Sequence, residues 1–464
     1  MRNTLRVALV LWLLSLAVVV PFISSGYSEL KRAAASNSYN EAAQHYEIAA
    51  RRIPWRADLY ELAGHEYYRA KEYTQADAAY QNAMNHNMLS ADGWVAWGDV
   101  NYLNNDSKRA AEIWQQGLAQ KNFSENLYSR LAEIYQEQGD YAKAAEYLQN
   151  YVSVHSKDAS AHYRLGLLLT LSDPNRALSE LISASQLDPQ IDPAVQTLRT
   201  ALNIASLNEA PSERFVIIGR GLGLVEEWQL ARAAFESATR ADEKNAEAWA
   251  WLGEANQHTG VNRSDELDTA LSLNPNSATV RGLRGLYFQR AGNFRQALTE
   301  FQAAATLDAN NPAWMVSIGE SYSKLGDLIR ALQAYQYATT LAPEDAKYWR
   351  LLAIFCAQNN VNIKDVGIPA AQRAVALAKD DLASLDVLGW TYLLDARYTD
   401  AEKMLNRALE LDSQNPSVHL HLGMLYLQKG DRFSAYSHLI QARDKGSDKA
   451  VHENATAILN QYFP

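Results

Sequence analysis

The residues able to do chemistry in this 464-residue chain are few, and their spacing does not suit catalysis. The stretch Gly219-Arg-Gly-Leu-Gly223 resembles a phosphate-binding loop, but such a loop follows a strand, and this one falls within an expected helix. His419 and His421 are two residues apart, a spacing that points two side chains to different faces of a helix. The motifs Gly-x-Ser-x-Gly, His-Glu-x-x-His and the P-loop do not occur. We therefore expect no enzymatic activity and no catalytic, cofactor-binding or metal-binding residue.

Composition indicates an all-α protein that does not bind nucleic acid. Alanine, leucine, glutamine, glutamate and arginine dominate, and these residues lose little free energy on entering a helix. The formal net charge is −10 and no long basic run occurs, so a nucleic-acid partner is not expected. The single cysteine, Cys356, cannot form an intramolecular disulfide and falls at a packing position of its predicted helix. Its expected role is that of a small buried hydrophobic residue.

An internal repeat of about 34 residues determines which side chains meet. In one unit, the large residues Trp94 and Asn101 flank Gly98, and a second helix then brings Ala110 and Trp114. Small residues at these positions let two helices approach closely, while large neighbours on the same helical face fill the gaps. The small residue of the first helix recurs eleven times, at Gly64, Gly98, Ala132, Gly166, Gly219, Gly253, Gly285, Gly319, Ala353, Gly389 and Gly423.

This pattern resembles the tetratricopeptide repeat family, whose consensus is Trp-x2-Leu-Gly-x2-Tyr followed by Ala-x3-Phe-x2-Ala and a proline. The resemblance covers about residues 23 to 449. It implies an all-α, right-handed superhelical solenoid of about eleven to twelve helical hairpins, preceded by an N-terminal hydrophobic helix. One hairpin cannot bury its apolar face alone, so stacked neighbours supply the core. The resemblance also implies that other proteins or peptides bind in a concave groove lined by the first helix of each repeat.

Irregular spacing predicts five segments. The interval from Ala159 to Ser212 is longer than one repeat and contains an additional amphipathic helix with Pro193 in its first turn. We expect a transmembrane anchor or signal peptide at 1–26, an N-terminal array at 27–189, an inserted helix or linker at 190–211, a C-terminal array at 212–449, and a capping helix at 450–464.

The N-terminal segment predicts where the protein resides. Arg2 and Arg6 precede an apolar run at 7–23, which as a helix spans about 25 Å, slightly less than the ~30 Å hydrocarbon core. One interpretation is a single-pass anchor in the cytoplasmic membrane, with the repeats outside the cytoplasm. A second is a signal peptide cleaved near Ser24-Ser25-Gly26, which would secrete the protein. A third is a helix buried within the protein.

The expected groove positions offer acidic and apolar side chains. The family subgroup that grips acidic C-termini uses Lys and Asn where this chain has Glu61 and His65, so that clamp is not expected. The other acidic groove positions are Asp99, Glu133, Glu254 and Glu320. Tyr68 and Tyr102 form a small apolar set near the N-terminal groove. A larger apolar set lies in the last two repeats, at Trp390, Leu393, Leu394, Leu420, Met424 and Leu427.

Two interpretations of the larger apolar set are open: it binds a partner, or the C-terminal helix covers it. The leading functional hypothesis is a non-catalytic scaffold or adaptor that presents its groove to partner proteins outside the cytoplasmic membrane. The alternatives are an extracytoplasmic holdase for unfolded chains and an accessory subunit of an envelope polysaccharide or secretion complex.

Overall fold

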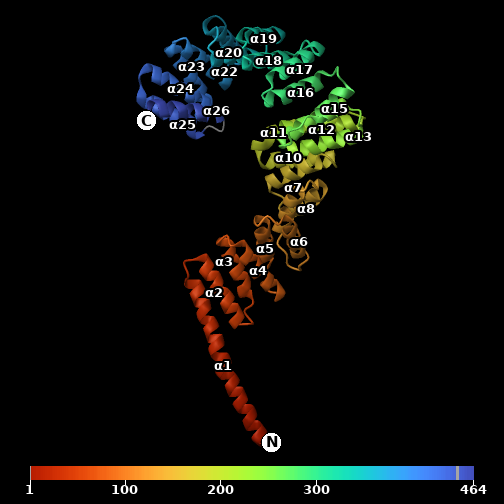
Figure 1. Ribbon diagram of the computed structural model, residues 1–464, viewed down its shortest axis with the longest axis vertical. Helices are drawn as coiled ribbons and strands as arrows, with labels where there is room; N and C mark the ends of the chain where they lie inside the picture. The colour runs from red at the N-terminus through yellow and green to blue at the C-terminus, as the bar shows by residue number, and fades with distance from the viewer. Residues whose placement is uncertain (1, 446–448) are drawn as a thin grey trace. The chain divides into compact units, whose positions relative to one another are not determined.

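Within the described residues the protein is entirely helical. The computed structural model describes residues 2–445 and 449–464, without the side chains of residues 2–11, 14 and 15. These residues form 26 α-helices, one 3-10 turn (η1, Pro189–Ile191) and one π turn (η2, Ile363–Gly367), and no strand (Figure 1). The predicted all-α class and hairpin solenoid are confirmed.

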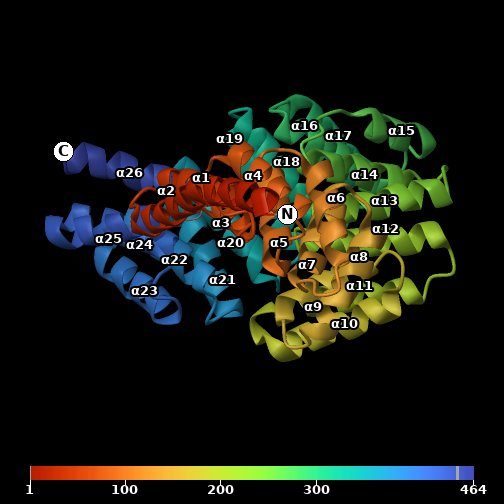
Figure 2. The same ribbon diagram turned by 90° about the horizontal axis from the view of Figure 1, so that it is seen from below.

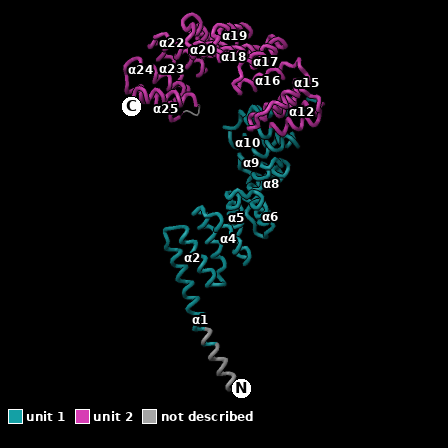
Figure 3. Tube along the Cα trace, viewed as in Figure 1, with its two compact units in different colours: residues 1–208, 220–230 teal, residues 209–219, 231–464 magenta. Residues whose placement is uncertain are grey.

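The helices divide into two compact units (Figure 3). The first unit contains residues 1–208 and 220–230, and the second contains 209–219 and 231–464. The hairpins of the first unit are α1 (Arg2–Ala35) with α2 (Tyr39–Arg52), α3 (Asp58–Arg69) with α4 (Tyr73–Asn85), α5 (Ala91–Leu103) with α6 (Ser107–Leu118), α7 (Asn126–Glu137) with α8 (Tyr141–Val154), and α9 (Ala159–Leu169) with α10 (Pro174–Leu187). A single helix, α11 (Asp192–Ser206), follows them where the inserted helix was predicted.

Helices α12 (Pro211–Leu224) and α13 (Trp228–Ala241) contribute residues to both units. The second unit continues with α14 (Ala246–His258) and α15 (Asp265–Leu273), α16 (Ala278–Arg290) and α17 (Phe294–Leu307), α18 (Pro312–Lys324) and α19 (Leu328–Leu341), α20 (Ala346–Asn359) and α21 (Ile368–Leu377), α22 (Leu382–Leu394) and α23 (Tyr398–Leu411), α24 (Pro416–Lys429) and α25 (Arg432–Lys445), and the terminal α26 (Lys449–Tyr462). The members of a hairpin, such as α16 and α17, lie side by side in both views (Figures 1 and 2).

Each hairpin is closed by a small residue that faces a large one. A Cβ atom built on Gly319 of α18 would lie 2.9 Å from the ring of Tyr335 on α19, too close for a real contact. The large residue usually follows the glycine by sixteen positions, as in Gly64 with Tyr80, Gly98 with Trp114, Gly219 with Phe235, Gly285 with Phe301, Gly389 with Leu405 and Gly423 with Leu439. The repeat therefore encodes the distance between the two helices of a hairpin.

The turns between helices follow from local chemistry. Gly326 adopts φ +82° after α18, a conformation that glycine reaches without steric cost. The next residue, Asp327, accepts a hydrogen bond from the Arg330 backbone N–H at 3.1 Å and so caps α19. Gly430 and Asp431 repeat this arrangement between α24 and α25. A glycine followed by an aspartate thus ends one helix and starts the next at these turns.

The longer repeat around Cys356 accommodates its extra residues in the π turn η2 between α20 and α21. Cys356 is fully buried on α20, and its Cβ would lie 3.0 Å from a Cβ on Gly367. Burial raises the pKa of the thiol to about 11, so the residue is a packed thiol and not a reactive thiolate.

The predicted membrane anchor at 1–26 is contradicted. In the described part of the chain, no helix combines the length and apolar character that crossing a membrane requires. Helix α1 does not end with its apolar run. Its second half pairs with α2, where Glu29 is buried and accepts hydrogen bonds from Arg52 at 3.3 Å and from His45 at 2.7 Å. The predicted single-pass topology with extracytoplasmic repeats is therefore wrong, and secretion after cleavage finds no support in the described residues.

Gly319→Leu tests the contact that closes the hairpins. The added side chain overpacks against Tyr335, so we expect the free energy of unfolding to fall by about 1–3 kcal/mol or more. Gln333→Leu adds a leucine at an exposed position of α19 and is the matched control. Urea denaturation followed by circular dichroism measures both, and equal midpoints for the two variants would contradict the assigned register.

Candidate functional site

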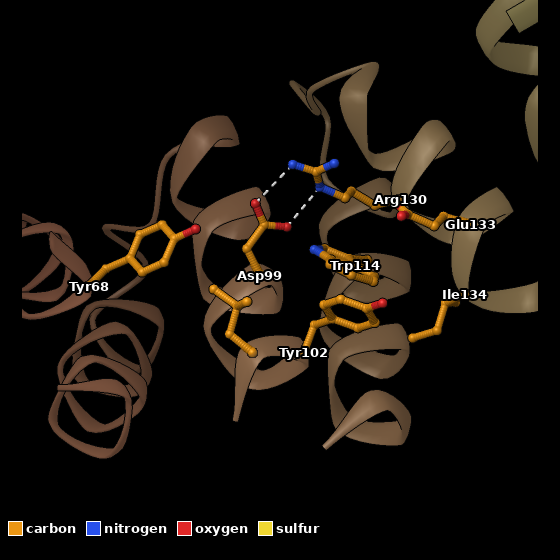
Figure 4. Close-up of a pocket in the computed structure, with 8 residues that line it drawn as sticks. Tyr68, Asp99, Tyr102, Trp114, Arg130, Glu133 and Ile134 are labelled. Atoms are coloured by element: carbon orange, nitrogen blue, oxygen red, sulfur yellow. Dashed lines mark hydrogen bonds and ion pairs between the residues drawn. The ribbon is translucent and has the colours of Figure 1, made fainter. Parts of the chain in front are cut away.

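The first unit carries two adjoining hollows along the first helices of its repeats, which we call together the N-terminal groove. The α5–α7 hollow has a volume of about 200 Å³ and the α7–α9 hollow about 380 Å³. The first is lined by Tyr68, Asp99, Tyr102, Leu103, Trp114, Arg130, Glu133 and Ile134 (Figure 4). The second is lined by Ser129, Ala132, Glu133, Gln136, Leu148, Tyr151, Asp158, Ser160, Ala161, Arg164 and Leu168. Glu133 on α7 belongs to both.

The α5–α7 hollow has a fixed aromatic wall. Trp114 is buried, and its indole N–H donates to the Val95 carbonyl at 3.1 Å. The Tyr102 ring lies 6.2 Å from the Trp114 ring, and its hydroxyl donates to Glu137 at 2.5 Å. This hydrogen bond, together with burial, raises the pKa of Tyr102 to about 12. The polar atoms of both rings are therefore engaged within the protein, which leaves apolar surface for a ligand.

Opposite charges cancel in the groove except at Glu133. Arg130 of α7 donates to both carboxylate oxygens of Asp99 on α5, at 2.8 and 3.1 Å (Figure 4). These hydrogen bonds raise the pKa of Arg130. In the α7–α9 hollow, Arg164 donates to both oxygens of Glu227 at 3.0 Å. Glu133 is exposed and lies near enough to Arg130 to help raise the pKa of that residue, but no salt bridge or hydrogen bond to the Glu133 carboxylate is found in the described part of the chain.

Comparison with known proteins places this architecture in a family. A family model described as Tetratricopeptide repeat matches residues 129–190, 225–260, 282–346, 316–381 and 387–431, more than half of the chain. The chain belongs to the tetratricopeptide repeat family. Members of this family serve as scaffolds for protein–protein interactions.

Several curated proteins are similar to this tetratricopeptide repeat protein. Superkiller complex protein 3 of Homo sapiens is 22% identical over 68% of this chain and 20% of its own length. The TPR repeat-containing protein YpiA of Bacillus subtilis (strain 168) is 20% identical over 74% of this chain and 85% of its own. The crystal structure of the APC/C hetero-tetramer Cut9-Hcn1 aligns with a TM-score of 0.44 and 15% identity over 92% of this chain and 93% of that one. The chain spans about a fifth of the length of the Superkiller relative.

Most of the acidic groove residues predicted for this tetratricopeptide repeat protein have partners inside the fold. Glu61 accepts hydrogen bonds from Ser90 at the start of α5 and lies 3.4 Å from His65. Burial acts to raise the pKa of Glu61, but the hydrogen bonds from His65 and Ser90 outweigh this effect and hold the pKa below its usual range. Glu254 is buried and accepts from Arg290 at 2.9 Å. Together with the Asp99–Arg130 pair, these contacts give three of the five predicted acidic residues partners within the protein.

Two predicted acidic residues remain, the exposed Glu133 on α7 and Glu320, which is half-buried on α18; no ion pair or hydrogen bond to Glu320 is found among the described residues. The sequence pointed to Tyr68, Tyr102 and Glu133 but missed the roles of Trp114 and Arg130. The signal for the Asp99–Arg130 pair is the spacing of 31 residues, which places opposite charges on the first helices of consecutive repeats.

The apolar set predicted in the last repeats is not one open surface. Leu420 retains 6% exposure because α26 packs Ala455 and Leu459 against it, and Met424 and Leu427 pack against the same cluster. Leu393 is buried to the same extent in the neighbouring core. Trp390 is half-buried and stacks on His421 with a ring separation of 4.7 Å, while Leu394 retains 37% exposure. Leu420, Met424 and Leu427 therefore fit the interpretation in which the C-terminal helix covers the apolar set.

Leu420→Ala and Leu394→Ala form a matched pair that tests this covering. Leu420→Ala leaves a cavity under α26 and should lower the free energy of unfolding by about 2–5 kcal/mol. Leu394→Ala removes the same atoms from an exposed site and should change the free energy of unfolding by about 0.5 kcal/mol or less. Equal effects on the denaturation midpoint would show that Leu420 is open to solvent.

The buried His419 and the half-buried His438 near the C-terminus form a hydrogen-bonded pair. The Nδ1 atoms of His419 and His438 are 2.8 Å apart, and His419 Nε2 lies 3.1 Å from the Ser413 carbonyl oxygen. The carbonyl requires a proton on Nε2, so neutral His419 accepts through Nδ1 and His438 donates. Burial lowers the pKa of both imidazoles. Among the described residues, no group of three or more His, Cys, Asp or Glu side chains is placed to hold a metal ion.

This pair predicts a pH-dependent stability. Because the folded pKa values lie below the unfolded value of about 6.5, the contribution is complete above that pH and is lost as pH falls through the folded values. Asp412, which favours protonation of His419, and Lys445, which opposes it, are the charged neighbours, and Tyr426 stacks on His438.

We expect the melting temperature to fall between pH 7.5 and 5.5, and to fall less in His438→Gln, which cannot titrate. The exposed His86→Gln is the control and should retain the wild-type slope. Thermal scans by circular dichroism at several pH values provide the measurement. If the melting temperature changes with pH equally in both variants, the histidine pair is not the source of the pH dependence.

Proposed function

We propose that this protein is a non-catalytic scaffold that holds a segment of a partner protein in the N-terminal groove. The observation that carries the proposal is the pair of adjoining hollows on α5, α7 and α9, with an apolar wall and one unpaired carboxylate. Exposed apolar surface bordered by polar groups is a common feature of partner sites. The family's general role as an interaction scaffold supports the same conclusion.

The fold suits this role because the groove needs little reorganisation on binding. The aromatic wall and the Asp99–Arg130 pair are held by contacts within and between repeats, so the ordering cost is met on folding. The hollows lie on helices, which position side chains more precisely than loops do. Binding is then presentation of a preformed surface, with no bond made or broken.

The holdase alternative depends on open apolar surface in the last repeats. Helix α26 occupies that position over Leu420, Met424 and Leu427, so the alternative has no corresponding surface there. The N-terminal groove mixes apolar with charged groups, a combination that favours a specific segment over unfolded chains in general.

Site-specific photo-crosslinking in cells tests the proposal. A photoreactive phenylalanine analogue at Leu103, which is 46% exposed in the α5–α7 hollow, should capture a discrete partner. The same analogue at Leu187, which is 42% exposed at the end of α10 and lines neither hollow, is the control. Identical products from both positions, or none from Leu103, would contradict the proposal.

A further inference from the structure

We infer that the N-terminal groove selects a partner segment in which an aromatic side chain is followed closely by lysine or arginine. This inference rests on the proposed function and adds the chemistry of the partner. It follows from what the hollow leaves unsatisfied once its internal contacts are counted.

The α5–α7 hollow has the size and lining for one aromatic ring. A cavity of about 150 Å³ is sufficient to hold benzene, and this hollow measures about 200 Å³. Its wall contains the rings of Tyr68, Tyr102 and Trp114, with Leu103 and Ile134 beside them. Aromatic pairs in offset or edge-to-face contact gain energy beyond burial of their area. An aromatic side chain therefore gains more from this wall than an aliphatic one.

The polar groups around the hollow do not favour a polar occupant. The Trp114 N–H bonds to the Val95 carbonyl, and the Tyr102 hydroxyl bonds to Glu137. The Arg130 guanidinium is held by both oxygens of Asp99. A polar side chain entering the hollow would lose its water without gaining these donors, which costs free energy.

The charge next to the hollow favours a cation. The residues that line the two hollows include three acids, Asp99, Glu133 and Asp158, and two bases, Arg130 and Arg164. Both arginines are already paired with carboxylates, so neither presents an uncompensated charge to a partner. Asp99 is occupied in the same way, and Asp158 caps α9 through the Ala161 N–H at 3.0 Å. The exposed carboxylate of Glu133 is left as the charge that a partner meets.

Geometry sets the spacing of the two partner residues. Glu133 lines the same hollow as the aromatic wall, so one extended segment can reach both. Residues two apart in an extended chain point to the same side and are about 7 Å apart. The expected motif is thus an aromatic residue, any residue, and then lysine or arginine. An acidic residue at the last position would face Glu133 and be disfavoured.

Three fluorescein-labelled peptides in a Gly-Ser context, with cores Trp-Ser-Lys, Trp-Ser-Glu and Ala-Ser-Lys, test the inference by fluorescence anisotropy on the full chain. We expect Trp-Ser-Lys to bind about threefold or more tighter than Trp-Ser-Glu, and about tenfold or more tighter than Ala-Ser-Lys. Glu133→Lys should reverse the preference between lysine and glutamate. Glu146→Gln, at an exposed position of α8, is the control and should keep the wild-type order.

Each outcome bears on one part of the inference. Equal binding of Trp-Ser-Lys and Trp-Ser-Glu overturns the role of Glu133, and equal binding of Trp-Ser-Lys and Ala-Ser-Lys overturns the aromatic site. Failure of all three peptides to bind at millimolar concentration overturns both. The proposed function is judged separately by crosslinking at Leu103, so a discrete crosslinked partner with no peptide preference would leave the scaffold role standing and reject only the motif.

Discussion

The structure depends on the close approach of two helices where a small residue of one meets a large side chain of the other. Gly98 and Trp114, or Gly285 and Phe301, bring the members of a hairpin together, and each large ring also contacts the next repeat. Burying one such side chain contributes about 1.5–3 kcal/mol. No hairpin has enough of these contacts to be stable alone, so the core is shared between neighbours.

Deviations from the repeat show how this contact tolerates change. The short helix α15 places Leu267 against Gly253 at fourteen residues rather than sixteen, so the contact survives although the loop and helix are shorter. The longer repeat keeps Cys356 and Ala371 in the same core by placing its extra residues in the π turn η2. Both cases indicate that the packed pair is preserved while connecting segments vary, because loops tolerate length changes at low free-energy cost.

The surface available to partners is what remains after the repeats have satisfied their own groups. Asp99 and Glu254 are acidic side chains on first helices, yet both are paired with arginines of the following repeat. Glu133 lacks such a pair and lies between two hollows. Most of these charged groups thus pair between stacked repeats, and a small number remain available to bind a partner. Apolar side chains at the C-terminus are likewise used for packing within the protein, since α26 covers Leu420.

The sequence alone determined the helical class and the hairpins, because these follow from local spacing repeated many times, and it located the inserted helix as an interruption of that spacing. It did not determine which groove residues are available. Glu61 and Asp99 look alike in sequence to Glu133, and only tertiary structure brings Ser90 and Arg130 to the first two. The burial of Leu420 likewise needs Ala455 and Leu459 of α26, which are 35 and 39 residues away. Packing within a repeat is local and periodic, whereas availability depends on contacts between distant residues, which a one-dimensional pattern does not contain.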